Sequence, residues 1–186
     1  MAVSNRAALA LACVLSLGYG VGGSTDLAVA ADDDPVVAVQ GDVERPVRLK
    51  ASDLAKMPRQ SVKAKDHDGK ESVFEGIPVA LALEKAGVKL GQSLRGEAHA
   101  AYLLVEAADG YRVVFALPEV DESFSDRVIL LADRQDGKPL NAHKGPFQII
   151  VPGEKKHGRW VRQVTALTIK RVKSDAPTPK AATRPG

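Results

Sequence analysis

The sequence predicts an α+β domain, built on a mixed β-sheet with a few short helices. Three observations lead to this fold class. About eight apolar segments have the length of a strand and are separated by turns containing Asp-Gly, Gly or Pro. Only two or three segments have helical periodicity, and all of them are short. The strands do not alternate with long helices, so a doubly wound parallel sheet is not expected.

The expected elements follow one another along residues 36–172. Strands are expected over residues 37–43, 47–49, 61–65, 71–74, 102–106, 111–115, 128–133, 147–151 and 164–169. The first of these alternates only weakly and is expected to lie at a sheet edge. Asp68-Gly69 and Asp109-Gly110 are typical hairpin turns. The clearest helix covers residues 79–86, with Pro78 where a helix begins and Gly87 where one ends.

The two ends of the chain have different expected roles. Residues 1–30 resemble a cleavable signal peptide, with Arg6, an apolar stretch over residues 7–21 and a small-residue site at Ala28-Val29-Ala30. A periplasmic or secreted protein is therefore expected, with one domain over residues 31–172. Residues 173–186 are rich in Pro, Ala, Thr and Lys and are expected to be a disordered tail.

Composition narrows the function classes. A net charge of +3 with 4% aromatic residues does not indicate a nucleic-acid partner. Cys13 is the only cysteine and lies in the expected signal peptide, so the mature chain has no thiol. No mature segment has the length and apolarity of a membrane span.

A group of motifs in the second half of the chain resembles a known family. In order, they are Leu131-Ala132, Gly137-Lys138-Pro139-Leu140, His143-Lys144-Gly145-Pro146, Val151-Pro152-Gly153 and Val161-Arg162. Residues 74–79, 83–88 and 109–111 extend the pattern upstream. Over residues 36–172 the chain resembles the oxidoreductase molybdopterin-binding domain, which has the sulfite-oxidase fold.

The resemblance implies a molybdopterin cofactor whose molybdenum is bound by a cysteine thiolate, and oxygen-atom transfer at that metal. The sequence departs from this pattern in three ways. The mature chain has no cysteine, its N-terminal part is short, and Gln148 stands where the family often has arginine. We therefore expect no bound cofactor, although the resemblance implies molybdopterin.

The cationic residues of the same motifs predict an anion or pterin-phosphate pocket. Its expected members are His143, Lys144, Gly145, Arg159 and Arg162. Lys155, Lys156, His157 and the Gly153 amide belong to the same cluster. The alternative is a solvated surface loop without a ligand.

Other candidate residues give weaker signals. The four histidines, which include His67 and His99, do not have the spacing of a zinc site, so no metal is expected. Trp160 is expected to pack in the core under the cationic loop rather than on a ligand. Tyr111 either hydrogen-bonds across the pocket or, as the favoured alternative, forms a cross-strand aromatic contact.

The sequence therefore favours an exported module that binds a small anionic ligand or a periplasmic protein without catalysis, as a sensor or accessory component. A molybdopterin-dependent oxidoreductase with an unusual ligand set is the first alternative. A structural protein that pairs through an exposed sheet edge is the second.

Overall fold

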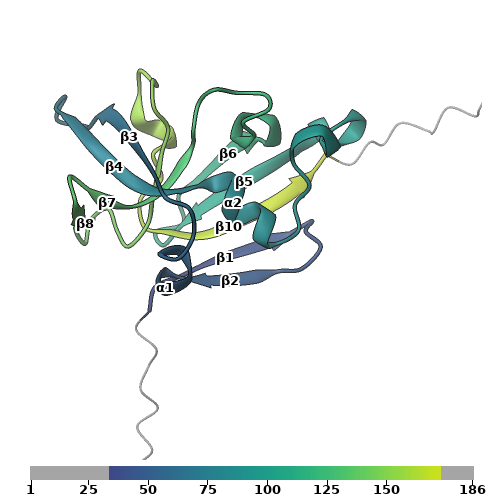
Figure 1. The fold of residues 1–186 in the computed structure, drawn as a ribbon, viewed down its shortest axis with the longest axis horizontal. Helices are drawn as coiled ribbons and strands as arrows, with labels where there is room; N and C mark the ends of the chain where they lie inside the picture. The colour runs from purple at the N-terminus through teal and green to yellow at the C-terminus, as the bar shows by residue number, and fades with distance from the viewer. Residues whose placement is uncertain (1–33, 173–186) are drawn as a thin grey trace, which may run out of the picture. The chain divides into compact units, whose positions relative to one another are not determined.

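The computed structural model describes residues 34–172. The expected signal peptide over residues 1–30 and the expected tail over residues 173–186 lie outside the described residues. Two five-stranded sheets form the scaffold (Figure 1). In spatial order, the first contains β2 (Val47–Lys50), β1 (Val36–Gly41), β10 (Val164–Arg171), β5 (Ala101–Ala107) and β6 (Arg112–Ala116). The second contains β3 (Gln60–Lys65), β4 (Glu71–Pro78), β7 (Leu130–Gln135) and β8 (Lys138–Pro139), with β9 (Gln148–Ile150) also paired to β7.

Helical segments are few and short. Two α-helices are present in the described residues, α1 (Ala51–Leu54) and α2 (Val79–Lys85), with 3-10 turns η1 (Gly91–Ser93), η2 (Gly96–Ala100), η3 (Leu117–Val120) and η4 (His157–Arg159). None of the helices within residues 34–172 has the length and apolarity needed to span a bilayer.

The first sheet mixes the two kinds of strand pairing. β1 runs parallel to β10, whereas β10–β5, β5–β6 and β1–β2 are antiparallel. The α+β class with a mixed sheet is therefore confirmed. The expected edge position of the first strand is wrong, because β1 lies between β2 and β10. Its buried residues, Val37 and Val39, alternate as in a half-buried strand.

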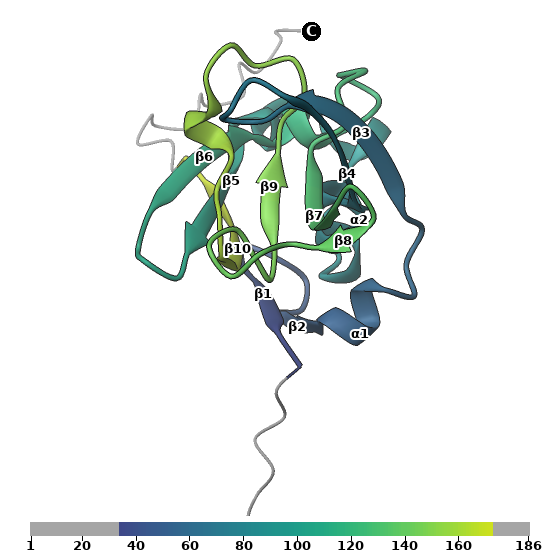
Figure 2. The ribbon, with the colours of Figure 1, turned by 90° about the vertical axis from the view of Figure 1, so that its left-hand side faces the viewer.

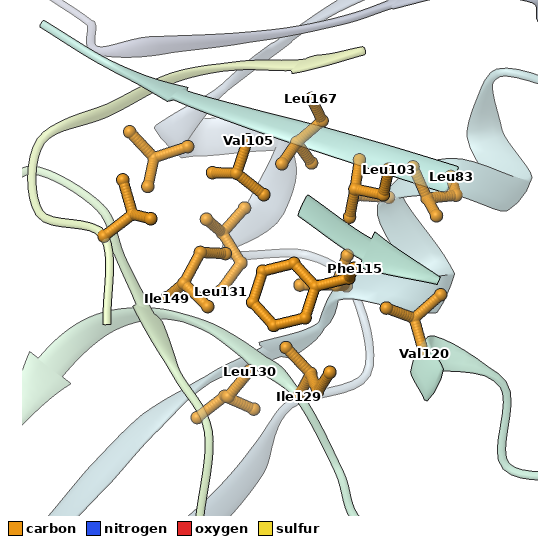
Figure 3. Close-up of a cluster of buried hydrophobic side chains, with 14 of the residues drawn as sticks. Leu83, Leu103, Val105, Phe115, Val120, Ile129, Leu130, Leu131, Ile149 and Leu167 are labelled. Atoms are coloured by element: carbon orange, nitrogen blue, oxygen red, sulfur yellow. The ribbon is translucent and has the colours of Figure 1, made fainter. Parts of the chain in front are cut away.

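One hydrophobic core joins the two sheets. Leu103, Val105 and Leu167 come from the first sheet, and Leu131 and Ile149 from the second (Figure 3). Figure 2 shows β9 and β7 beside β4, with β5 and β10 in the other sheet. All five side chains are at most 2% exposed, so packing of the two sheets supplies most of the apolar burial.

Two glycines fix the position of α2. A Cβ atom on Gly76 would lie 2.1 Å from the Leu131 carbonyl oxygen. Gly76 is at the register shift in the antiparallel pairing of β4 with β7. Only glycine allows this close approach of the two strands. Gly87 has a φ of 80° directly after the helix, as expected for a left-handed C-terminal cap. The helix predicted over residues 79–86 is confirmed to within one residue.

Candidate functional site

A pocket of about 340 Å³ lies where several loops meet beside the β5–β6 hairpin. Its lining residues are His67, Ala107, Asp109, Tyr111, His143, His157, Gly158, Trp160, Arg162 and Gln163. We call this site the histidine pocket. Its volume is at the small end of ligand sites, which usually enclose roughly 300–1,000 Å³, so a small ligand fits best.

Arg162 and His143 form the cationic side of the histidine pocket. Arg162 Nη1 lies 2.6 Å from His143 Nε2. A guanidinium is always protonated and can only donate, so His143 Nε2 accepts in this contact. Gln163 holds the two segments together, because its backbone N–H donates to the Lys144 carbonyl over 2.9 Å. Its side-chain amide also donates to the Ala142 carbonyl over 2.8 Å.

A second side of the pocket contains a row of three rings, in which His157 lies between His67 and Trp160. His157 Nε2 lies 2.8 Å from the Lys65 carbonyl oxygen, which can only accept, so this nitrogen carries a proton. The His157 ring centroid lies 4.5 Å from that of His67 and 4.3 Å from that of Trp160. Trp160 is 4% exposed, and its indole N–H donates to the Val151 carbonyl over 3.1 Å. The expected core position of Trp160 is therefore confirmed.

Tyr111 closes the rim of the pocket. Its hydroxyl donates to the Gly158 carbonyl over 2.7 Å, and its backbone N–H donates to Asp109 Oδ1 over 2.9 Å. The favoured cross-strand contact is wrong, because Tyr111 lies in the turn before β6 and is 50% exposed. The alternative, a hydrogen bond across the pocket, is the one that the structure contains.

Partial burial and neighbouring positive charges lower the pKa of His67. Burial is the largest cause, and repulsion from Arg162 and His157 adds to it, whereas the Asp66 carboxylate opposes the shift. His67 is therefore neutral at pH 7 in the unliganded pocket. Its ring nitrogens have no hydrogen-bond partner within residues 34–172.

Lys144 belongs to a polar network beside the pocket rather than to its lining. Lys144 Nζ lies 2.5 Å from Asp66 Oδ2 and 2.7 Å from Gln135 Oε1. Gln135 Nε2 in turn donates to Asp66 Oδ2 and to Ser72 Oγ, both over 2.9 Å. Burial alone would raise the pKa of Asp66. Hydrogen bonds from Lys144, the His67 N–H and Gln135 outweigh burial and lower the pKa to about 2.

Arg159 is also held by carboxylates outside the pocket. Its Nε donates to Glu154 Oε1 over 2.7 Å and its Nη1 to Glu119 Oε2 over 2.8 Å. The guanidinium carbon lies 4.6 Å from the centroid of the Phe115 ring, which adds a cation–π contact. Burial would lower the pKa of Arg159, but the hydrogen bonds from its side chain to Glu119 and Glu154 outweigh burial and raise it.

The structure thus separates the five residues expected to form an anion pocket. His143 and Arg162 line the histidine pocket, whereas Lys144 and Arg159 are occupied by carboxylates. The Gly145 N–H donates to the Asn141 carbonyl over 2.8 Å within its own turn. Gln148, the other residue singled out by the resemblance, is fully buried on β9 opposite Ala132 and does not line the pocket.

Comparison with known proteins identifies the family. Residues 26–178 match the family model of the oxidoreductase molybdopterin binding domain. The chain belongs to this family. As a member of the molybdopterin-binding family, it is also similar in fold to a chain of the crystal structure of the sulfane dehydrogenase SoxCD from Paracoccus pantotrophus. The TM-score is 0.59 with 23% sequence identity over 75% of the present chain. The present chain spans 39% of that chain's length. No curated protein matches the sequence.

The described residues of this family member do not supply the donor set that the sequence resemblance implies. Residues 34–172 contain no cysteine, so no thiolate can bind molybdenum there. Within the same residues, no group of three or more His, Cys, Asp or Glu side chains is arranged to hold a metal ion. The residues of the histidine pocket therefore do not fit a thiolate-bound molybdenum centre.

Sequence reasoning did not assign His67 to the pocket. Its local pattern, Asp66-His67-Asp68-Gly69, indicates only a hairpin turn. His67 reaches the pocket because β3 pairs with β4 from Gln60↔Gly76 to Lys65↔Glu71, which places the turn beside His157. No signal within the turn itself could have shown this contact.

Proposed function

We propose that this protein is an exported member of the molybdopterin-binding family that binds a small anion in the histidine pocket, as a sensor or accessory module. In this proposal it does not catalyse oxygen-atom transfer at a thiolate-bound molybdenum. The signal-peptide pattern of residues 1–30 supports a periplasmic or secreted location.

The observation that carries the proposal is the unneutralised charge of Arg162. Its guanidinium contacts His143 Nε2 and has no carboxylate partner within residues 34–172. Asp109 is the only carboxylate residue in the pocket lining, and one of its oxygens accepts from the Tyr111 N–H. A small anion would supply the missing counter-charge and accept hydrogen bonds from the guanidinium fork.

The missing thiol supports the non-catalytic part of the proposal. A soft thiolate is the ligand that the family resemblance implies for molybdenum, and Cys13 would be lost with the signal peptide. The name of the structural neighbour, a sulfane dehydrogenase, suggests which anions to try first. Thiosulfate carries a sulfane sulfur and two negative charges, and sulfate is the matching anion without that sulfur.

The experiment measures thiosulfate and sulfate binding to the purified protein by isothermal titration calorimetry. Replacing Arg162 with Met should weaken binding by about 10- to 100-fold, because a charge-assisted hydrogen bond contributes about 1.5–3 kcal/mol. The matched control is Arg127→Met, which removes an exposed arginine outside the pocket. It should bind as the wild type does.

Equal affinities in Arg162→Met and the wild type would overturn the anion site. Elemental analysis of protein purified from its own host tests the other half of the proposal. One molybdenum per chain, with turnover of an oxyanion or sulfoxide, would favour the oxidoreductase alternative instead.

A further inference from the structure

We infer that His67 takes up a proton when the histidine pocket binds an anion, which makes His67 a determinant of anion affinity that is sensitive to pH. This inference rests on the proposed function, because it describes how the same pocket recognises its ligand. It follows from the hydrogen-bonding roles of the three pocket histidines.

His143 cannot serve as the proton acceptor without losing its partner. Its Nε2 accepts from Arg162 over 2.6 Å, and a proton on that nitrogen would place two donors against each other. Protonation of His143 would therefore break the contact that orients Arg162.

His157 already uses one ring nitrogen as a donor. Its Nε2–H donates to the Lys65 carbonyl over 2.8 Å, and its ring packs between His67 and Trp160. His67 differs, since its side chain lines the pocket and its ring has no hydrogen-bond partner in the described part of the chain. A proton on His67 would create a new donor for an anion without breaking an existing hydrogen bond.

The charges around His67 decide when it accepts this proton. The groups that face it are Arg162, His157, Lys144, Asp66, His143 and, across the pocket, Asp109. Asp66 is the nearest carboxylate, but Lys144 already neutralises most of its charge. Without an anion, partial burial lowers the pKa of His67, and repulsion from Arg162 adds to it.

A bound anion reverses this balance. Its negative charge offsets Arg162 and favours the imidazolium, so the pKa of His67 rises on binding. At pH values between the pKa of His67 in the free protein and its pKa in the anion-bound protein, anion binding is accompanied by uptake of a proton. In this range the anion affinity increases as pH falls. For one proton, the limit is about tenfold in affinity per pH unit. Well above the bound pKa, the affinity no longer depends on pH.

The test is calorimetric titration with sulfate, which stays doubly charged over the whole range, from about pH 5.5 to about pH 8.5, around the ordinary histidine pKa of about 6.5. Two buffers with different ionisation enthalpies give the number of protons taken up. The wild type should bind more tightly at low pH, with uptake approaching one proton. His67→Gln should lose this proton uptake and the gain in affinity at low pH.

The matched control is His99→Gln, because His99 packs on Phe124, with ring centroids 5.4 Å apart, and does not line the pocket. It should retain the proton uptake of the wild type. Anion binding with the same affinity across the pH range, or unchanged uptake in His67→Gln, would overturn this inference and leave the anion site intact. No binding at any pH would overturn the proposed function, and this inference with it.

Discussion

Arg159 and Arg162 lie in the same short segment of the chain but in opposite electrostatic environments. Arg159 is bound by Glu119 and Glu154 and lies over the Phe115 ring. Arg162 has no carboxylate partner within residues 34–172 and lines the histidine pocket beside His143. The first arginine holds loops together, whereas the second leaves its charge available to a ligand.

Lys144 and His143, which are neighbours on the facing loop, also differ in their surroundings. Lys144 is 13% exposed at its side chain and ion-paired with Asp66, whereas its neighbour His143 lines the pocket. The count of cations in a motif therefore does not measure its capacity for anions. What matters is which cations the fold has already neutralised.

The largest effect should come from Lys144→Met. Removing the ammonium leaves the buried Asp66 carboxylate with only Gln135 and the His67 N–H as partners. Breaking a buried ion pair in this way should lower the free energy of unfolding by about 3 kcal/mol. Urea denaturation measures this free energy of unfolding. Lys155 is exposed, so Lys155→Met is the control and should stay within about 0.5 kcal/mol of the wild type. Equal stability of the two variants would show that Lys144 is not a structural cation.

The same ion pair should make stability depend on pH in the acid range. The pKa of Asp66 is about 2 in the folded protein and 3.8 as its ordinary value, so its contribution is complete above about pH 4. It is lost as pH falls towards about 2, and amounts to about 2.5 kcal/mol at 1.36 kcal/mol per pKa unit. Because other carboxylates titrate there too, the quantity to measure is the difference in unfolding free energy between the wild type and Asp66→Asn. A difference that stays constant from pH 5 to about pH 2 would contradict the lowered pKa.

Most of the fold could be predicted from the sequence because its elements have local causes. The β5–β6 hairpin follows from alternating apolar residues around Asp109-Gly110, and α2 from Pro78 and Gly87. The position of β1 has no local cause. It depends on parallel pairing with β10, which joins residues as distant as Gln40 and Thr168. A weakly alternating strand looks the same at an edge and inside a sheet.

The site was less predictable for a related reason. The motif around His143 and Arg162 could be found because both residues lie in one segment of the chain. Of the two carboxylates that pair with Arg159, Glu154 lies in this segment too, but Glu119 lies 40 residues earlier in the sequence and could not be found from the motif. His67 likewise enters the pocket through the β3–β4 hairpin. Ligand capacity therefore depended on long-range contacts that no pattern in the motif encodes.

A smaller effect should come from Arg159→Met. The side chain of Arg159 is 30% exposed, so solvent screens its two ion pairs, and their loss should cost about 1–2 kcal/mol of unfolding free energy. Sulfate affinity should stay within about twofold of the wild type, because the Arg159 charge does not face the pocket. Thermal unfolding and calorimetric titration measure the two quantities. A large loss of affinity at unchanged stability would place Arg159 with Arg162 and remove the contrast between them.

The smallest effect should come from Tyr111→Phe, which removes only the hydroxyl that donates to the Gly158 carbonyl. Because Tyr111 is 50% exposed, water replaces the lost partner, and the cost should be about 0.5 kcal/mol. Amide hydrogen exchange should nevertheless increase near Gly158, since this bond ties the hairpin turn to the loop that carries His157. Tyr102→Phe is the matched control, because no hydrogen bond of its hydroxyl is present in residues 34–172. Faster exchange in both variants would show that the Tyr111 hydroxyl does not position the histidine side of the pocket.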